Sequence, residues 1–597
     1  MKKPSLFEIL FNKDDQIEIN DSVRGNKFFS QQFSGSVTKQ LKRIQSRGLF
    51  RFLSSFSHLL THVSTRVYGS ALLTFGAVST MMYLLRLSQD GSILTFIIGL
   101  LFVLISIPFL LYDKPLPVVL ASFNLTDYIF YELFCMKRHT TEVVVPFPLM
   151  VSVIIGFVAA ALSFVVPLWQ IAVVIGILVC VYVGIESPEF LFLASLFTLP
   201  YLRFVPNGEI WLVAAVVFAI LSFLVKVLYG KRVIYIEQYD VFIGIMLMMV
   251  LISGIFIKGT ESFSSSLRMI ALSLGYVLAG NIITNRRLAE RSVNAVVMSG
   301  VLSALVSFAQ FTVVLINNND NLSLDSLSFI LARREGMVVF LIAATLLAVG
   351  MIRQSSGGIS KIAYICSSII LSLSLLLSGE LFALVATLIG IAVYFIIKGN
   401  IRPGLILPVL AIIPLTLLIL PNSFLNLIFL NSPSISFAED LFNLWDKSLS
   451  VFANNILVGI GIGSESFVEE MAALGIFDHC DSSNLFIEFG LEAGVIALIF
   501  FLCVLFTRIK HRSINYVYLR NSENEHLSCI SGACILSLLA FGAVNYIWSE
   551  PSAYYFFWCL FGIGSAIIRV AKKDYDDKVV YYEESSAFDS SVIDIEI

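Results

Sequence analysis

The sequence predicts an all-α protein, a polytopic membrane helix bundle of about 14–16 transmembrane helices, and three observations lead to this. Hydrophobic residues make up 57% of the 597 residues, charged residues only 14%, and the mean hydropathy is +0.88. A soluble domain carries roughly a quarter charged residues. Apolar runs of about 20 residues, long enough to cross a bilayer as helices, recur along most of the chain.

Composition also narrows the possible partners. The net charge of −3 argues against a nucleic-acid partner. The eight cysteines lie mostly inside apolar runs and show neither metal-ligand spacing nor a disulfide framework. No apolar segment stands near the start of the chain, so we expect no cleavable signal peptide. We expect no cofactor and no metal.

Taken in order, the chain begins with a basic N-terminal tail, residues 1–66, which includes a possible amphipathic segment near 48–62. Residues 67–316 form a first group of spans, 317–570 a second group, and 571–597 an acidic tail. Residues 115–135 are too interrupted by Pro, Asn and Asp to span, so an interfacial helix is expected there. The individual spans lie near 67–87, 92–112, 147–167, 169–185, 189–206, 210–229, 240–257, 268–284, 293–316, 336–353, 361–379, 381–398, 403–421, 484–506, 527–547 and 552–570.

Basic residues fix the expected orientation, because cytoplasmic loops are enriched in Lys and Arg. With the N-terminus inside, alternate loops carry the basic clusters, and both termini are cytoplasmic: Lys137/Arg138, Lys231/Arg232, Arg286/Arg287/Arg291, Arg353/Lys361, Lys398/Arg402, Arg508/Lys510/Arg512 and Lys572/Lys573. The opposite side then holds loop 317–335, a tight turn at Ser378–Glu380, and a large extracytoplasmic loop, 422–483, before the last three spans.

The stretch from Leu441 to Phe506 concentrates the polar features of this outer side. It carries glycines at 459, 461 and 463, which permit close approach of a backbone to a ligand or equally to a neighbouring helix. Asn484, Glu488 and Glu492 follow at i, i+4 and i+8 and therefore share one helical face. Carboxylates inside a span usually face a polar cavity. Asn484 and Glu488 also fit the solvated end of a helix.

These residues resemble the O-antigen ligase and polysaccharide polymerase superfamily. That family has a Trp before a glycine-rich loop, then His-Asn at the mouth of a helix, then Glu-x-Gly. The resemblance covers roughly residues 310–570 and rests on Trp445, Gly459, Gly461, Asn484, Glu492 and Gly494, with the Ser378 turn in the place of the family's Ser-Arg-Gly turn. It implies a metal-independent glycosyltransferase that moves a polyprenyl-pyrophosphate-linked oligosaccharide to an acceptor glycan, with basic residues holding the pyrophosphate.

The sequence departs from that pattern at three polar positions. Glu380 stands near the family's turn arginine, no Arg precedes Trp445 within five residues, and Ser483 replaces the His before Asn484. We therefore expect the roles to be re-sited. His479 is the candidate general base, with Glu380 and Glu492 as candidate catalytic carboxyls. Guanidinium groups bind phosphate oxygens, so the candidates that hold the pyrophosphate are Arg333, Arg334, Arg203 and Arg268. The other substrate-binding candidates are Trp445, Asn484, Gly459 and Gly461.

Each candidate has a simpler explanation as well. His479 also fits a solvated loop, Glu380 a surface turn, and the arginines helix-end charges that reach to headgroups. The expectation is a polymerase or ligase of surface polysaccharide on the outer face of a bacterial cytoplasmic membrane, with the lipid-linked glycan and membrane lipid as partners. The alternatives are a flippase of lipid-linked sugars, or an inactive scaffold whose partners are other polysaccharide assembly proteins.

Overall fold

The computed structural model of the protein is all-α, and the residues that it describes contain no β-strand. It describes residues 63–85, 93–122, 148–162, 183–184, 187–228, 232–256, 260–317, 334–398 except 356 and 379, 435–474, and 481–593 except 521 and 523. Within these ranges ten helices are long and apolar enough to cross a membrane, and four shorter apolar helices accompany them. The protein is thus a multi-pass membrane protein built as a helix bundle.

Contacts divide the chain into two units. The first comprises Met1–Phe190 and Leu221–Val233, and the second comprises Leu191–Ile220 and Ile234–Ile597. Two helices run from one unit into the other along the chain, α10 (Pro188–Thr198) and α11 (Gly208–Leu228). A short 3₁₀ helix, η3 (Leu199–Phe204), joins them.

The first unit is a small packed group of helices. Its members are α4 (Thr65–Leu85), α5 (Ile93–Leu111), α6 (Leu116–Ser122) and α8 (Leu149–Leu162), and α4 packs against both α5 and α8. Small residues let these helices approach closely: a Cβ placed on Gly76 would lie 2.8 Å from the carbonyl oxygen of Gly99. The Ser70 and Ser152 hydroxyls join α4 to α8 at 2.5 Å.

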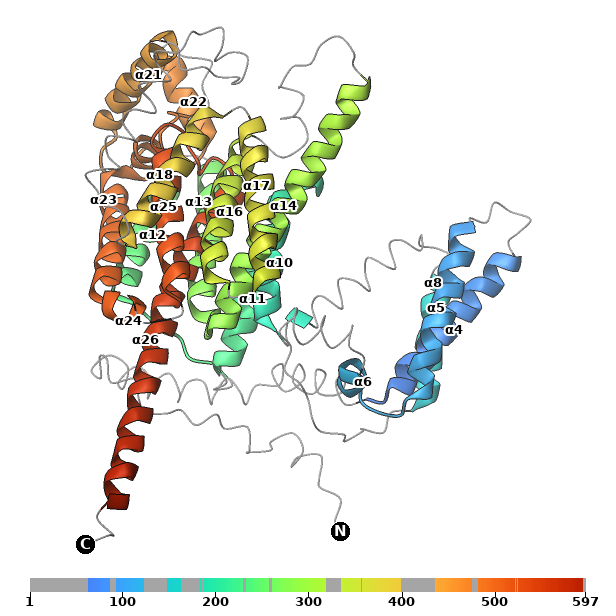
Figure 1. The fold of residues 1–597 in the computed structure, drawn as a ribbon. Helices are drawn as coiled ribbons and strands as arrows, with labels where there is room; N and C mark the ends of the chain where they lie inside the picture. The colour runs from blue at the N-terminus through green and yellow to red at the C-terminus, as the bar shows by residue number, and fades with distance from the viewer. Residues whose placement is uncertain are drawn as a thin grey trace. The chain divides into compact units, whose positions relative to one another are not determined.

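The second unit is the larger bundle and holds the candidate site (Figure 1). Helices α16 and α26 form its centre, because most residues of their apolar stretches are buried, as expected of helices that are apolar all round. Helix α26 packs against α13, α25, α14 and α16. The helices are α12 (Gln238–Phe256), α13 (Thr260–Ile282), α14 (Arg286–Asn317), α16 (Arg334–Gln354), α17 (Gly358–Leu377), α18 (Leu381–Ile397), α21 (Ile435–Asn454), α22 (Ser464–Ala473), α23 (Leu485–Ile514), α24 (Tyr516–Arg520), α25 (Glu525–Gly542) and α26 (Pro551–Ile593).

Several sequence expectations differ in detail from the structure. The segment 422–483, expected to be a loop, contains two helices, α21 and α22. In α21, apolar residues two turns apart, such as Leu444 and Val451, lie on one buried face, which is typical of an amphipathic helix. Helix α23 runs eight residues beyond its predicted span, to Ile514 rather than 506, and α26 continues through 571–593, which contain no Pro or Gly. Only α6 is described within the expected interfacial helix 115–135. The tail segment 1–62, most of span 169–185, span 403–421 and most of loop 317–335 lie outside the described residues.

Candidate functional site

Helix α23 is broken near its start, and this break organises the site. Asn484 caps the helix: its Oδ1 accepts hydrogen bonds from the backbone N–H groups of Phe486 (2.9 Å) and Ile487 (3.2 Å). Further along, Gly494 adopts φ 84° and ψ 169°, which is not helical. Irregular backbone at membrane depth is tolerated only where protein groups satisfy its polar atoms.

Residues 455–463, here called the glycine loop, supply those partners. In a regular helix the Val495 N–H would bond to the Leu491 carbonyl. Instead the Val495 N–H donates to the Ile456 carbonyl (2.8 Å), and the Leu491 carbonyl accepts from the Ile460 N–H (2.7 Å). One helical bond is thus replaced by two bonds to the glycine loop.

The approach of the two backbones explains the glycines. Gly459, Gly461 and Gly463 have φ values of 81°, 101° and 124°, a region that favours glycine. A Cβ on Gly459 would lie 2.4 Å from the Leu491 carbonyl oxygen, and one on Gly494 would lie 2.2 Å from that of Leu457. Side chains at these positions would push the loop and the helix apart.

Glu492 links the glycine loop to the segment between α25 and α26. The residue is only 3% exposed. Oε1 accepts a hydrogen bond from the Gly463 N–H (3.1 Å), and Oε2 accepts one from the Tyr546 hydroxyl (2.5 Å), which lies between α25 and α26. Burial, followed by the nearby Glu492 carboxyl, raises the pKa of Tyr546 well above its usual value, so this hydroxyl keeps its proton and acts as a donor.

Glu488 is buried beside Glu492, as expected for residues four apart on one face. Its Oε2 accepts a hydrogen bond from the Ser482 N–H at 2.7 Å. Among the residues the structure describes, no Lys, Arg or His forms a salt bridge with either carboxyl. Nor do the described ranges bring three or more His, Cys, Asp and Glu side chains together in a way that could hold a metal ion.

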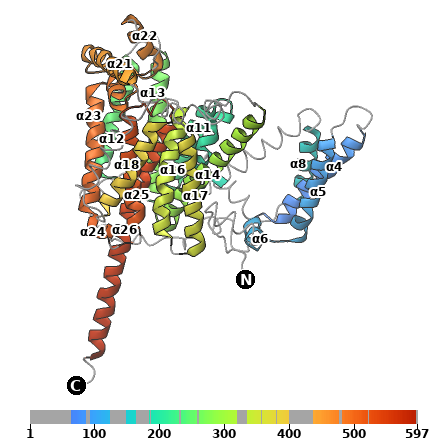
Figure 2. The same cartoon turned by 45° about the horizontal axis from the view of Figure 1, so that its top comes forward.

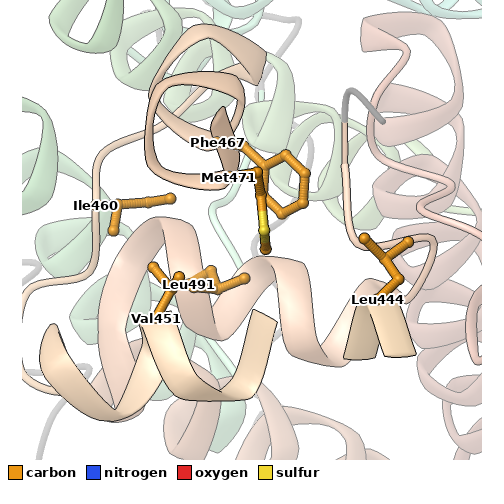
Figure 3. Close-up of a cluster of buried hydrophobic side chains, with 6 residues drawn as sticks. All are labelled: Leu444, Val451, Ile460, Phe467, Met471 and Leu491. Carbon is orange, nitrogen blue, oxygen red and sulfur yellow. The ribbon is translucent and has the colours of Figure 1, made fainter. Parts of the chain in front are cut away.

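Helix α21 covers the glycine loop. Leu444, Val451, Ile460, Phe467, Met471 and Leu491 form one buried cluster that joins α21, the loop, α22 and α23 (Figure 3). Trp445, half-buried on α21, donates its Nε1–H to the Ser482 carbonyl at 3.1 Å. The Asn484 side-chain N–H donates to the Ala543 carbonyl (2.8 Å), which links the start of α23 to the end of α25. Figure 2 shows α21 and α22 at one end of this unit, beside α13.

Arg268 is the predicted basic residue that the structure brings to the loop. Ser262, near the start of α13, accepts a hydrogen bond from the Ile462 N–H at 3.0 Å. One turn further, Ser265 accepts from Arg268 Nη2 at 3.2 Å and lies 3.6 Å from a Cβ built on Gly463. Arg268 also pairs with Glu209 at 2.7 Å, yet its side chain remains 42% exposed. An exposed cation therefore lies at the edge of the glycine loop.

Arg203 and Arg334 lie on two elements that pack together at another place on the same unit. Arg203 belongs to η3 and Arg334 begins α16. These two elements and the start of α26 line a small, mostly apolar pocket whose walls include Leu199, Pro200, Met337, Phe340, Ser552 and Phe556. The side chains of Arg203 and Arg334 are not among those the structure describes, so only their positions on these elements are known.

The remaining predicted residues are not joined to the glycine loop by any described contact. Glu380 precedes α18, half-buried, and its side chain does not cap that helix. The Ser378–Glu380 turn itself lies where the sequence predicts it, between α17 and α18. His479 and Arg333 lie outside the described residues.

Three residues of the site are not predicted from the sequence. Tyr546 binds Glu492, Ser253 donates to the Glu492 carbonyl at 2.6 Å, and Ser262 accepts from the glycine loop. For Tyr546 a signal exists, because Asn545–Glu550 forms a short polar and aromatic segment between two spans. The two serines resemble many other serines of the spans, and nothing in the sequence distinguishes them.

Comparisons with known proteins add no relative: no family model matches the sequence, and no curated protein matches it.

Proposed function

We propose that the protein is a membrane glycosyltransferase of the polysaccharide polymerase or ligase type. It transfers a polyprenyl-pyrophosphate-linked oligosaccharide, undecaprenyl in a bacterial cytoplasmic membrane, to an acceptor glycan on the outer face. The observation that carries this proposal is the meeting of Trp445, Asn484, the glycine loop and Arg268 around the break in α23. About 14–16 spans, cytoplasmic termini and an outward-facing segment 422–483 belong to the same proposal.

The residues divide into different roles under this proposal. Arg268 contacts the pyrophosphate, since a half-exposed guanidinium can exchange Glu209 for phosphate oxygens. The leaving pyrophosphate needs charge stabilisation more than protonation. Glu492 acts as a positioning residue, because both of its oxygens already accept hydrogen bonds that hold the glycine loop and Tyr546. His479 remains the proposed general base, and Glu380, Arg203, Arg333 and Arg334 remain proposed contacts of the glycan or its lipid carrier.

Arg268→Gln is expected to lower glycan transfer roughly tenfold to a hundredfold, the range for losing one hydrogen bond to a charged group. The measurement is the length distribution of products formed from lipid-linked oligosaccharide by the purified protein in proteoliposomes. Arg286→Gln is the matched control, since Arg286 also forms a half-exposed ion pair, with Glu290 on α14. Equal product ladders from wild type and Arg268→Gln would remove Arg268 from the site, and a wild type that never extends the glycan would refute the proposal.

Sidedness gives an independent check. A cysteine at exposed Glu470 on α22 is expected to react with a membrane-impermeant maleimide added to intact spheroplasts, whereas one at exposed Lys361 on α17 is not. The labelling is read against a protein carrying only the native cysteines. Labelling of the Lys361 position alone would place the glycine loop in the cytosol, away from any outer-leaflet glycan.

One observation favours the flippase alternative. A broken helix that carries two buried carboxyls without a described basic partner is common in transporters, where such breaks bind ions or substrate. A flippase would move labelled lipid-linked oligosaccharide across proteoliposome membranes without lengthening it. The same vesicles used for the transfer assay therefore separate the two functions.

A further inference from the structure

The end of α23 opposite to the glycine loop contains a buried cation, two of whose three guanidinium nitrogens have no hydrogen-bond partner among the described residues. Arg508 is only 8% exposed. Its Nε and Nη1 make no hydrogen bond to any described residue. A buried guanidinium is normally paired, because removing a charge from water is costly unless an opposite charge and hydrogen bonds compensate. Figure 1 shows this end of α23 beside α24, away from α21 and α22.

Two further buried polar groups lie near Arg508. The Tyr239 hydroxyl, on α12, has no hydrogen bond of normal length to any described residue although Tyr239 is only 1% exposed, and the Ser565 and Tyr276 hydroxyls interact with it from a longer distance. Likewise His511 Nδ1 is buried without a hydrogen bond in the described residues. The Tyr239 ring lies 5.7 Å from that of His511, so the two side chains are neighbours.

Phe561 on α26 ties this cluster together. Its ring lies 5.9 Å from the Tyr239 ring and 5.6 Å from the Arg508 guanidinium carbon. The neighbouring Gly564 leaves room for the guanidinium, because a Cβ there would lie 2.5 Å from Arg508 Nη2. Four helices, α12, α13, α23 and α26, thus shape one buried polar site.

The other charges nearby are already engaged. Arg512 donates to Ser528 and Cys529, and Arg569 donates to the Gly280 and Ile283 carbonyls at the end of α13. Asp240 accepts from the Tyr276 hydroxyl and from the Glu237 N–H. Glu237 approaches His511 only to 3.9 Å.

The surroundings of Arg508 are positive on balance. Among the described side chains, three basic groups, Arg508, Arg569 and Lys572, interact electrostatically with the Glu237 carboxyl, and Arg569 also interacts with Asp240. Basic groups outnumber acidic ones in this set of interactions, which favours an anionic ligand over a cation. The hydrogen-bond donors present select the kind of anion, since guanidinium and hydroxyl donors suit phosphate oxygens.

We propose that Arg508, Tyr239 and His511 form a phosphate-binding site at this end of the bundle, here called the Arg508 site. The Arg508 Nε–H and Nη1–H groups, the Tyr239 hydroxyl and the His511 Nδ1–H donate to the oxygens of one phosphate group. That group belongs either to free inorganic phosphate or to a phospholipid headgroup. The Arg508 site is separate from the glycine loop, and the proposal does not depend on the proposed function.

The test is thermal unfolding of the purified, delipidated full-length protein in neutral detergent, with inorganic phosphate or with phosphatidic acid added. Wild type is expected to gain several degrees in Tm, because a ligand that binds only the folded state stabilises it. Arg508→Met is expected to lose this response. It should also be more stable than wild type without a probe, since it replaces an unpaired buried charge by an apolar side chain of similar length.

Two more variants sharpen the experiment. Tyr239→Phe removes one donor and keeps the ring, so the dissociation constant for the probe should rise roughly three- to tenfold. Arg512→Gln, on the same helix but already bonded to Ser528 and Cys529, should respond like wild type. If Arg508→Met does not fold, Tyr239→Phe provides the same test.

The outcomes are distinct. A response to both probes identifies a site for the phosphate group itself, and a response to phosphatidic acid alone identifies a headgroup site. The proposal is overturned if neither probe raises the wild-type Tm, or if Arg508→Met or Tyr239→Phe keeps the full response.

Discussion

Gly494→Ala is expected to separate the glycine loop from α23 and to unfold this end of the bundle. The added Cβ would lie 2.2 Å from the Leu457 carbonyl oxygen, and alanine would have to hold φ at 84°. Strain of this kind costs about 1–3 kcal/mol. Loss of the two backbone hydrogen bonds across the break adds about 1 kcal/mol for each. The measurements are the amount of protein in the membrane and its Tm after extraction.

Gly244→Ala on α12 is the matched control for this change. No atom lies within 4 Å of a Cβ built there, and alanine is the better helix former. The control should keep or slightly raise the Tm. If Gly494→Ala and Gly244→Ala unfold at the same temperature, the close approach at Gly494 does not exist in the protein.

Glu492→Ala is expected to be the second most damaging change. It leaves the half-buried Gly463 N–H and the buried Tyr546 hydroxyl without an acceptor, at up to about 1–3 kcal/mol for each unsatisfied group. Glu492→Gln should cost less, since its amide oxygen can still accept one of the two bonds. The readout is the free energy of unfolding in denaturant.

A double-mutant cycle with Tyr546→Phe separates this network from nonspecific damage. Because the two side chains share a hydrogen bond, their combined effect should differ from the sum of the single effects by about 0.5–3 kcal/mol. Glu469→Ala, on the exposed side of α22, should change little and should add independently. Strict additivity between Glu492→Ala and Tyr546→Phe would show that the two groups do not interact.

The sequence predicts the helical class and part of the site because both depend on periodic side-chain patterns. Apolar runs predict most of the described spans, and the four-residue spacing of Asn484, Glu488 and Glu492 predicts that they share one helical face. The sequence left open whether that face meets water, and the structure buries all three residues. Such patterns report which side of a helix avoids water. They carry no information about which distant segment covers that side.

For that reason the sequence does not predict that the glycine loop packs against the break in α23. Ile460 and Leu491 are joined through their peptide groups, which every residue possesses, so the pairing leaves no mark in the side chains. Arg508 is a different case. Counting basic residues by position assigns it to a cytoplasmic loop, whereas α23 continues past it and turns its side chain inward. Position along the chain sets the sidedness of a charge, but the helical face sets its burial.

The main-chain joint between the glycine loop and α23 has an evolutionary consequence. The backbone hydrogen bonds that join Val495 to Ile456 and Ile460 to Leu491 would survive almost any exchange of the side chains beside them. Only a few positions, chiefly the glycines at close approach, are held fixed by geometry. The amino-acid sequence around this contact is therefore free to diverge while the backbone hydrogen bonds are kept. Comparison of backbone structures should detect distant relatives that sequence alignment misses.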